Sequence, residues 1–339
     1  MVSLAVVGLG QWGKNHARVA LQLLKEGQLD QVILCDTDRR RLQGYPKDAE
    51  TSDDPSRVRQ PDVDAVDIVT PAESHFALAG EFLAAGKHVF VEKPMAMHAG
   101  EARALLEIAG QKGLTLMPGH IFRYHPGVQE VRTRIQRGFF GEIRYLGTIR
   151  TAFVEPRPDV GVLFSLGIHE ADLYPYLLGE EYPEMARADT AAFLDPSIDE
   201  VASMFFRFNG GRVGFAFESW ISPGRIKERR LTVVGTDRTA EIDYLHPETM
   251  TIHESKMIRD SDAGWRFEEG ESHTVRVDTR EPLREEMEDF IRAVGGGGKY
   301  KPRADAACGY RAVEIIEALK VSGSYVPPHG TSRKAIPIA

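Results

Sequence analysis

The stretch LAVVGLGQWG, residues 4–13, places a short apolar run directly before three glycines spaced G-x-G-x-x-G. Gly8 suits a tight turn, Gly10 allows a bound group to approach the backbone, and Gly13 allows a helix to pack closely on a strand. Residues 15–25 then carry apolar side chains at helical spacing. The stretch therefore predicts a strand, a glycine turn and a helix whose N terminus can hold a pyrophosphate.

An acidic residue follows the next predicted strand, at residues 32–35. Asp36 lies 23 residues after Gly13, and a carboxylate there accepts hydrogen bonds from a dinucleotide ribose and repels a 2′-phosphate. We therefore expect NAD rather than NADP, although the nearby Arg39 and Arg40 soften that preference. The alternative is a nucleotide-free glycine turn with Asp36 as an ordinary cap. The cofactor-binding residues expected from this part are Gly8, Gly10, Gln11, Trp12, Gly13 and Asp36.

The first third of the chain alternates apolar strands with helices. Further strands are predicted at residues 65–69, 88–91 and 114–117, and helices at residues 75–85 and 99–111. This alternation is typical of βαβ units, in which helices cover both faces of a parallel sheet. We therefore predict an α/β protein whose N-terminal Rossmann dinucleotide-binding domain covers residues 1–120.

After residue 120 the pattern changes to consecutive strands joined by short turns. Strands are predicted at residues 144–154, 201–208, 212–220, 229–234, 239–244, 249–254 and 273–277. Helices are predicted at residues 128–136, 167–178, 283–294 and 304–320. Such an order favours a largely antiparallel sheet in a C-terminal α/β domain, residues 121–339, whose role is substrate binding and oligomerisation. Whether the final helices pack back on the first domain stays open.

Composition limits the partners of this chain. Its 339 residues carry 42 Lys and Arg against 50 Asp and Glu, a formal charge of −8, which disfavours nucleic acid as the main partner. No apolar run approaches the roughly 18–20 residues of a membrane span. Two cysteines, Cys35 and Cys308, are too few for a disulfide framework. With no export leader recognised, we expect a cytoplasmic protein that binds neither nucleic acid nor membrane.

A charged pair follows the strand predicted at residues 88–91. Glu92 and Lys93 stand at its carboxyl end, the edge at which open α/β sheets bind ligands. Pro94 stiffens the turn that carries Lys93. The plain alternative is a solvated ion pair at the end of a strand.

Several motifs resemble those of a known family. They are Thr70-Pro71, Ser74-His75, Ala85-Gly86-Lys87-His88-Val89, Glu92-Lys93-Pro94, GHIFRYHP at residues 119–126 and GVLFSLGIHEAD at residues 161–172. Together they resemble the glucose–fructose oxidoreductase, inositol dehydrogenase and rhizopine-catabolism family (Gfo/Idh/MocA). The resemblance implies an open antiparallel sheet in the second domain and homodimers or homotetramers built by sheet-face packing. It also implies oxidation of a secondary hydroxyl of a sugar or cyclitol. The further cofactor contacts expected are Thr70, Pro71, His75, Glu92 and Lys93.

Lys93 and His169 match the family's usual catalytic residues. Histidine titrates near neutral pH without perturbation, whereas lysine needs a large downward shift of its pKa. His169 is therefore expected to be the main base, and Lys93 to hydrogen-bond the hydroxyl and stabilise the alkoxide. The roles can be exchanged, and without the motif His169 would be an ordinary surface histidine.

The chain departs from the family pattern at one point. Many members have an aspartate four residues before the histidine, where this chain has Ser165. The catalytic carboxylate of those members is therefore missing or replaced. Asp172 shares a helix face with His169, and either orients the imidazole or binds the substrate.

Residues 150–172 and 218–223 look most like those of sugar-nucleotide 3-dehydrogenases that act on UDP-N-acetylglucosamine or its uronic acid. A diphosphate needs fixed cations, and guanidinium groups bind phosphate oxygens in pairs. The arginines considered are Arg123, Arg150, Arg157 and Arg225. The expected substrate-binding residues are Arg123, Tyr124, Arg157, Ser165 and Asp172, with no metal. The product would be a 3-keto sugar nucleotide, the substrate of an aminotransferase.

Two other functions stay open at this point. One is a dehydrogenase of a free sugar or inositol, and the other is a regulatory protein that binds NAD without turnover. The remaining histidines lack a motif context and are interpreted as surface residues: His16, His98, His246, His253 and His329. Trp220, Phe215 and Phe217 are interpreted as sheet core.

Overall fold

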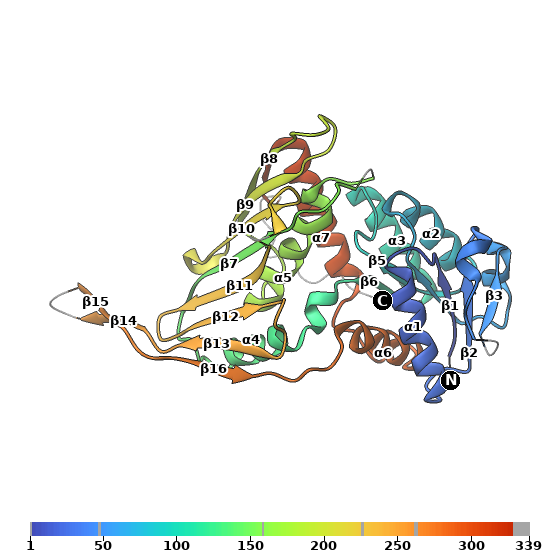
Figure 1. The fold of residues 1–339 in the computed structure, drawn as a ribbon, viewed down its shortest axis with the longest axis horizontal. Helices are drawn as coiled ribbons and strands as arrows, with labels where there is room; N and C mark the ends of the chain where they lie inside the picture. Colours follow the sequence, from blue (N-terminus) through green and yellow to red (C-terminus); the bar gives the residue numbers. More distant parts are fainter. Residues whose placement is uncertain (1, 47–48, 158, 225–226, 261–263, 328–339) are drawn as a thin grey trace. The chain divides into compact units, whose positions relative to one another are not determined.

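The computed structural model describes residues 2–46, 49–157, 159–224, 227–260 and 264–327. This part of the chain forms two compact units (Figure 1). Unit 1 contains residues 2–121 and 281–314, and unit 2 contains residues 122–280 and 315–327. The residues predicted as one second domain, 121–339, are therefore divided between the two units. None of the described helices is long and apolar enough to cross a membrane.

Unit 1 is built on a six-stranded parallel sheet in the order β3-β2-β1-β4-β5-β6. The strands are β1 (Ser3–Val7), β2 (Gln31–Cys35), β3 (Glu50–Ser52), β4 (Ala65–Ile68), β5 (His88–Glu92) and β6 (Leu116–Gly119). The helices are α1 (Gly13–Lys25), α2 (His75–Ala84), α3 (Ala99–Lys112) and α6 (Pro282–Gly295), with short turns η1 (Arg39–Leu42), η2 (Pro55–Arg59) and η3 (Ala72–Ser74). Helix α1 packs with α6, and α2 packs with α3. This order and the parallel pairing confirm the predicted Rossmann domain.

The parallel sheet explains why predicted site residues from distant sequence positions meet. Apart from the edge strand β3, its strands are buried along almost their whole length, which requires near-continuous apolar runs. Because all six strands point the same way, the residues that follow them lie at one edge. Gly8 follows β1, Asp36 follows β2, and Lys93 follows β5.

Unit 2 holds a nine-stranded sheet in the order β16-β13-β12-β11-β7-β10-β9-β8-β17. The strands are β7 (Ile143–Thr151), β8 (Met185–Ala191), β9 (Val201–Arg207), β10 (Val213–Ser219), β11 (Glu228–Gly235), β12 (Thr239–Asp243), β13 (Thr249–His253), β16 (Ser272–Arg276) and β17 (Ser324–Tyr325). The pairing is antiparallel except between β7 and β10, so the prediction of a mostly antiparallel sheet is confirmed. The helices are η4 (Ile121–Tyr124), α4 (Pro126–Gln136), η5 (Leu163–Gly167), α5 (Ile168–Leu178), η6 (Asn209–Gly211) and α7 (Ala306–Ser322), which begins in unit 1.

One face of this sheet presents aromatic side chains to solvent. Burial alternates along β9 and β10, as expected for strands with one covered face. Phe215 and Phe217 are each 43% exposed, and Phe205 is 36% exposed. The interpretation of Phe215 and Phe217 as sheet core is therefore wrong, while Trp220 is buried.

A separate hairpin, β14 (Lys256–Asp260) and β15 (Gly264–Glu268), extends away from the nine-stranded sheet (Figure 1). The sequence patterns did not predict this hairpin.

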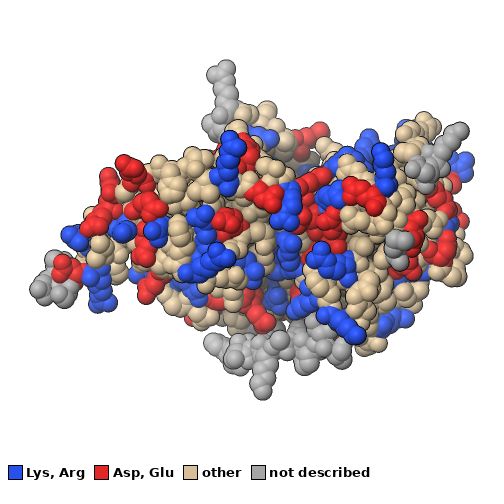
Figure 2. Space-filling model, turned by 90° about the horizontal axis from the view of Figure 1, so that it is seen from below, with Lys and Arg blue, Asp and Glu red and all other residues tan. Residues whose placement is uncertain are grey.

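Figure 2 shows one face of the molecule, on which basic and acidic side chains are interspersed. That arrangement fits the many surface ion pairs between neighbouring residues, such as Arg157 with Asp159.

Candidate active site

The glycine turn after β1 leaves space for a bound group at one glycine only. Gly8 has φ +94°, and a Cβ there would lie 2.7 Å from the carbonyl oxygen of Val69. A Cβ on Gly13 would lie 1.9 Å from the carbonyl oxygen of Gly8, so side chains are excluded at both glycines. A Cβ on Gly10 would meet only the Arg41 guanidinium, at 3.8 Å. No described side chain caps the N terminus of α1, so the residues fit a pyrophosphate at Gly10.

Asp36 is held in place by the backbone around it. Its Oδ2 accepts the Leu9 N–H at 2.7 Å, and its Oδ1 accepts the Asp38 N–H at 2.8 Å. Arg41 Nη1 lies 3.3 Å from Oδ2. An ionised carboxylate has about four acceptor directions, so Asp36 keeps capacity for ribose hydroxyls.

The cation beside Asp36 is Arg41 and not one of the two arginines named from the sequence. Arg39 pairs with Asp53, and Arg40 pairs with Asp38. The sequence distance of three or four residues from Asp36 did not reveal this, because η1 turns Arg39 and Arg40 toward other carboxylates.

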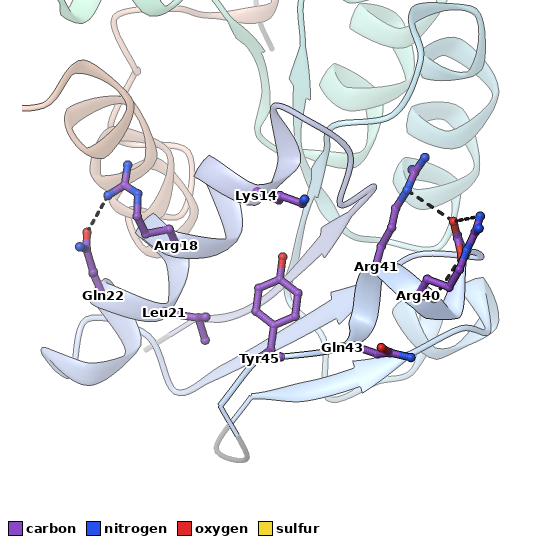
Figure 3. A pocket seen from close by; sticks show the side chains of 10 residues that line it. Lys14, Arg18, Leu21, Gln22, Arg40, Arg41, Gln43 and Tyr45 are labelled. Carbon is purple, nitrogen blue, oxygen red and sulfur yellow. Dashed lines mark hydrogen bonds and ion pairs between the residues drawn. The ribbon is translucent and has the colours of Figure 1, made fainter.

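A cavity of about 830 Å³ adjoins this part of the site (Figure 3). It lies between α1 and the segment that follows β2. Its lining residues are Lys14, Arg18, Leu21, Gln22, Asp38, Arg40, Arg41, Gln43, Gly44 and Tyr45. Figure 3 shows Lys14 and the Tyr45 hydroxyl directed toward each other, with the Arg41 side chain at the edge of the space beside them. With four basic residues against one acidic residue, the lining suits a polar or anionic group.

His75 joins the segments that follow β4 and β5. Its Nδ1 lies 2.7 Å from the carbonyl oxygen of Pro94, and its Nε2 lies 2.9 Å from that of Thr70. The Lys93–Pro94 peptide bond is cis. The imidazole therefore ties the turn that carries Lys93 to the loop at Thr70.

Glu92 connects the same turn to the glycine turn. Its Oε2 accepts the Lys93 N–H at 3.2 Å, and its Oε1 accepts the Trp12 indole N–H at 2.9 Å. The structure thus brings together the predicted residues Trp12, Glu92 and Lys93, although they come from segments 80 residues apart.

His16 also belongs to this group and was missed. It is completely buried, so its interpretation as a surface residue is wrong. Its ring lies between Asp67 and Glu92. His16 begins the spacing i, i+3, i+4, i+7 with Val19, Ala20 and Leu23, all of them buried. That helical pattern was the signal that could have revealed its burial.

In unit 2 the predicted residues lie on one helical segment. Ser165 belongs to η5, a π-helical turn, and His169 to α5, one turn further on. Both are buried. The His169 ring stands edge-on to Phe122 with their centroids 4.7 Å apart. Asp199 Oδ2 accepts the Leu163 N–H at 2.8 Å and so anchors the start of the segment.

Arg123 and Asp172 bind each other. Arg123 Nε lies 3.0 and 2.9 Å from the two carboxylate oxygens, and Nη2 lies 2.7 Å from Oδ1. The guanidinium also covers the Tyr176 ring, at 4.5 Å from the centroid. Tyr124, the neighbouring predicted residue, is buried in the core.

The remaining arginines differ in their access to a ligand. Arg150 is 0% exposed, with Nε 2.7 Å from Glu170 Oε1 and its guanidinium 4.0 Å from the Phe122 centroid. Its interpretation as a phosphate-binding residue is therefore wrong. Arg157 is partly exposed and pairs with Asp159 at 2.9 Å. Arg225 lies outside the described residues.

The cluster around Arg150 contains a second carboxyl group. Burial, and then the neighbouring Glu170 carboxylate, raise the pKa of Glu218 well above its usual value. The cations of Arg150 and Arg229 act in the opposite direction on this pKa, and Arg150 pairs with Glu170. This arrangement holds the strand that carries Arg150 against α5, next to His169.

Comparison with protein families decides the classification. The family described as an oxidoreductase family with an NAD-binding Rossmann fold matches residues 2–120, and the GFO/IDH/MocA C-terminal domain matches residues 128–241. The chain belongs to the Gfo/Idh/MocA family. Unit 1 therefore carries the NAD-binding domain of a Gfo/Idh/MocA oxidoreductase, and NAD is its cofactor.

Individual Gfo/Idh/MocA relatives cover most of the chain. UDP-N-acetylglucosamine 3-dehydrogenase from Acidithiobacillus ferrooxidans is 32% identical over 85% of this chain and 87% of its own length. A solved structure of that enzyme has a TM-score of 0.76, 29% identity, and covers 94% of this chain and 96% of its own. The scyllo-inositol 2-dehydrogenase (NAD(+)) of Bacillus subtilis is 29% identical over 75% of this chain and 78% of its own length.

Within this Gfo/Idh/MocA protein, the described residues provide two chemical capacities beside that of the cofactor. When bound, NAD supplies a hydride acceptor. The glycine turn and Asp36 suit the pyrophosphate and ribose. Lys93 and His169 are side chains able to hold or move a proton, and each stands on a segment that buried contacts hold in place.

Proposed function

We propose that the protein uses NAD to oxidise a secondary hydroxyl of a sugar nucleotide, at C3 of a UDP-N-acetyl-hexosamine. The observation that carries this proposal is the similarity to the UDP-N-acetylglucosamine 3-dehydrogenase, at 32% identity over 85% of the chain. The product is a 3-keto sugar nucleotide, a substrate suited to an aminotransferase. The whole protein is proposed to work as a homodimer or homotetramer through the aromatic sheet face of unit 2.

The chemical roles are assigned from the residues themselves. Oxidation of CH–OH removes a hydride from carbon and a proton from oxygen. His169 accepts the proton, and Lys93 hydrogen-bonds the hydroxyl oxygen and stabilises the negative charge that develops on it. The cofactor is held by Gly8, Gly10, Gln11, Trp12, Gly13 and Asp36, and by Thr70, Pro71, His75, Glu92 and Lys93.

Of the arginines considered from the sequence, only one is assigned to the diphosphate of the substrate. Arg157 is the described candidate whose guanidinium reaches solvent, so we assign it to the diphosphate. Ser165 is assigned a hydrogen bond to the sugar, because it stands one turn from His169. Arg123, Tyr124 and Asp172 are assigned to shaping the sugar site, since Arg123 and Asp172 neutralise each other.

A free cyclitol or sugar is the second candidate substrate. The similarity to the scyllo-inositol 2-dehydrogenase, 29% identical over 75% of the chain, favours it. In that case a phosphate-binding arginine is unnecessary, and Arg157→Ala leaves turnover unchanged.

A substrate panel tests the proposal. NADH formation is measured with UDP-N-acetylglucosamine, its uronic acid, glucose, myo-inositol and scyllo-inositol, with an aminotransferase present to remove the ketone. We expect turnover with a sugar nucleotide, lost in Lys93→Ala and kept in Lys25→Ala, an exposed lysine of α1. NADH binding, followed by fluorescence, should be kept in Lys25→Ala and largely kept in Lys93→Ala, because the glycine turn and Asp36 supply other cofactor contacts. Turnover of inositol alone would replace the first substrate by the second, and full activity of Lys93→Ala would overturn the assignment of the lysine.

A further inference from the structure

A buried group of three titratable side chains lies beside the turn that carries Lys93. His16 comes from α1, Asp67 from β4 and Glu92 from β5. His16 Nδ1 lies 2.7 Å from Asp67 Oδ2, and His16 Nε2 lies 3.2 Å from Glu92 Oε1. Because each ring nitrogen faces a carboxylate oxygen, the arrangement suits an imidazolium, which alone can donate from both nitrogens.

The surroundings of His16 favour the charged ring. Burial by itself lowers the pKa of His16, but the carboxylates of Asp67 and Glu92 outweigh it and raise the pKa to about 10. Burial also acts to raise the pKa of Glu92, yet His16, Lys93 and the Trp12 indole bring it below its usual value. Two aromatic rings contact His16, those of Trp12 and of Phe90 on β5, and neither carries a charge.

Glu92 connects His16 to the turn of unit 1 that carries Lys93. One of its oxygens accepts the Trp12 indole N–H, and the other accepts the Lys93 N–H. Without a cation at His16, the Glu92 carboxylate would be buried beside Asp67 with only Trp12 and Lys93 to hold it. A buried carboxylate in that state is neutralised or turns toward water.

We propose that His16 is a positioning residue for Lys93: as a buried cation between Asp67 and Glu92, it holds the Glu92 carboxylate in the orientation that fixes the Lys93 turn. This inference rests on the proposed function, because it assumes that Lys93 takes part in the reaction. His16 makes no described contact with Gly10 or Asp36, although its ring stands edge-on to Trp12. We therefore expect its main effect on turnover and a smaller one on cofactor affinity.

Kinetics of two histidine variants test the positioning role. His16→Gln removes the charge, and we expect kcat to fall about 10–100-fold while NADH affinity stays close to that of the unchanged protein. His88→Gln is the matched control, since His88 lies at the opposite end of β5 and its Nδ1 accepts the Thr115 N–H at 2.9 Å. The control should keep its kcat. If His16→Gln keeps full kcat while Lys93→Ala is inactive, the proposed function stands and the inference about His16 falls.

NMR of the unchanged protein tests the charge on His16, so the main observation does not depend on whether a variant folds. With histidine labelled at Cε1, NMR should show one imidazolium signal that does not titrate between about pH 6 and about pH 9. That signal should be absent from His16→Gln, and in Asp67→Asn it should titrate at lower pH because one carboxylate is gone. If no histidine signal keeps the imidazolium form up to about pH 9, the proposal is overturned, whatever the kinetics show.

Discussion

The guanidinium of Arg123 binds the carboxylate of Asp172 through nitrogen–oxygen contacts of 2.7 to 3.0 Å. Arg123 stands in η4, and Asp172 stands on α5, three residues after His169. The ion pair therefore ties the first segment of unit 2 to the helix that carries His169. Both oxygens of Asp172 thus lie against the Arg123 guanidinium, and the role of Asp172 in orienting the imidazole or binding the substrate stays a prediction.

Neutralising Asp172 should destabilise unit 2. Asp172→Asn removes the carboxylate charge that the buried Arg123 cation faces, and breaking a buried ion pair in this way costs about 3–5 kcal/mol. Denaturant unfolding should show this loss. Asp159→Asn, which breaks the more exposed pair with Arg157, is the control and should cost about 0–1 kcal/mol. If both variants lose the same free energy of unfolding, burial does not make the Arg123–Asp172 pair more important for stability than the exposed pair.

Removing Asp36 should change the preference between cofactors. In Asp36→Ala the ribose loses an acceptor, which we expect to weaken NAD binding by about 10-fold or more. NADP binding should weaken less, because Arg41 loses the nearer of its two carboxylate partners, keeps Asp38 at 3.8 Å, and can meet a 2′-phosphate. Fluorescence titration of both reduced cofactors measures this, with Asp53→Ala as control because Asp53 pairs with Arg39 instead. A parallel loss for both cofactors would count against the ribose role of Asp36.

His125 should make unit 2 sensitive to acid. Burial, and then the Arg150 cation, lower the pKa of His125 to about 4. The unfolded chain has the ordinary pKa of about 6.5, so it binds the proton more tightly than the folded chain. The stability associated with neutral His125 is thus fully present above about pH 6.5 and is lost as the pH falls through about 4.

Unfolding by urea at a series of pH values measures the contribution of His125. The free energy of unfolding of the unchanged protein should fall more steeply from pH 6.5 to pH 4 than that of His125→Phe. His246→Phe is the control, because the side chain of His246 is 70% exposed. If the free energy of unfolding falls equally with pH in all three proteins, the burial of neutral His125 does not cause the acid sensitivity.

The aromatic sheet face should control the oligomeric state. Phe205, Phe215 and Phe217 are exposed on neighbouring strands, and apolar patches of this kind mark interaction sites. We expect the double change Phe215→Lys and Phe217→Lys to shift the protein toward the monomer in light scattering. Phe193→Lys, at an exposed phenylalanine outside the strands, should leave the state unchanged. A monomeric unchanged protein would refute the proposed assembly.

The Rossmann unit was predictable because its signals are local. The glycines after β1, the acid after β2 and the apolar strands each reflect a requirement within a few residues of the chain. The Lys93 turn was predictable for the same reason, and its family motif added the roles. Arg41 escaped prediction because η1 turns Arg39 and Arg40 toward other carboxylates, and His16 because its partners Asp67 and Glu92 come from β4 and β5.

Which side chains of the unit 2 sheet face inward was harder to predict from the sequence. Phe215 and Phe217 suggest an inward face by their apolarity, yet the smaller Gly214 and Ala216 point inward. A Cβ on Gly214 would lie 2.5 Å from the Tyr174 ring, so that ring occupies the space. Arg150 escaped prediction for a related reason: its strand lies inside the sheet between β11 and β10, where even an arginine can be fully enclosed.

The return of residues 281–314 to unit 1 imposes an order on biosynthesis. Phe290 of α6 packs on Phe90 of β5, with ring centroids 5.6 Å apart. A nascent chain that has reached residue 280 holds every strand of the parallel sheet but lacks the helix that covers Phe90. The ribosome must therefore deliver residues 122–280 before the cofactor unit can close. Until then the half-finished sheet exposes an apolar surface of the kind that chaperones bind.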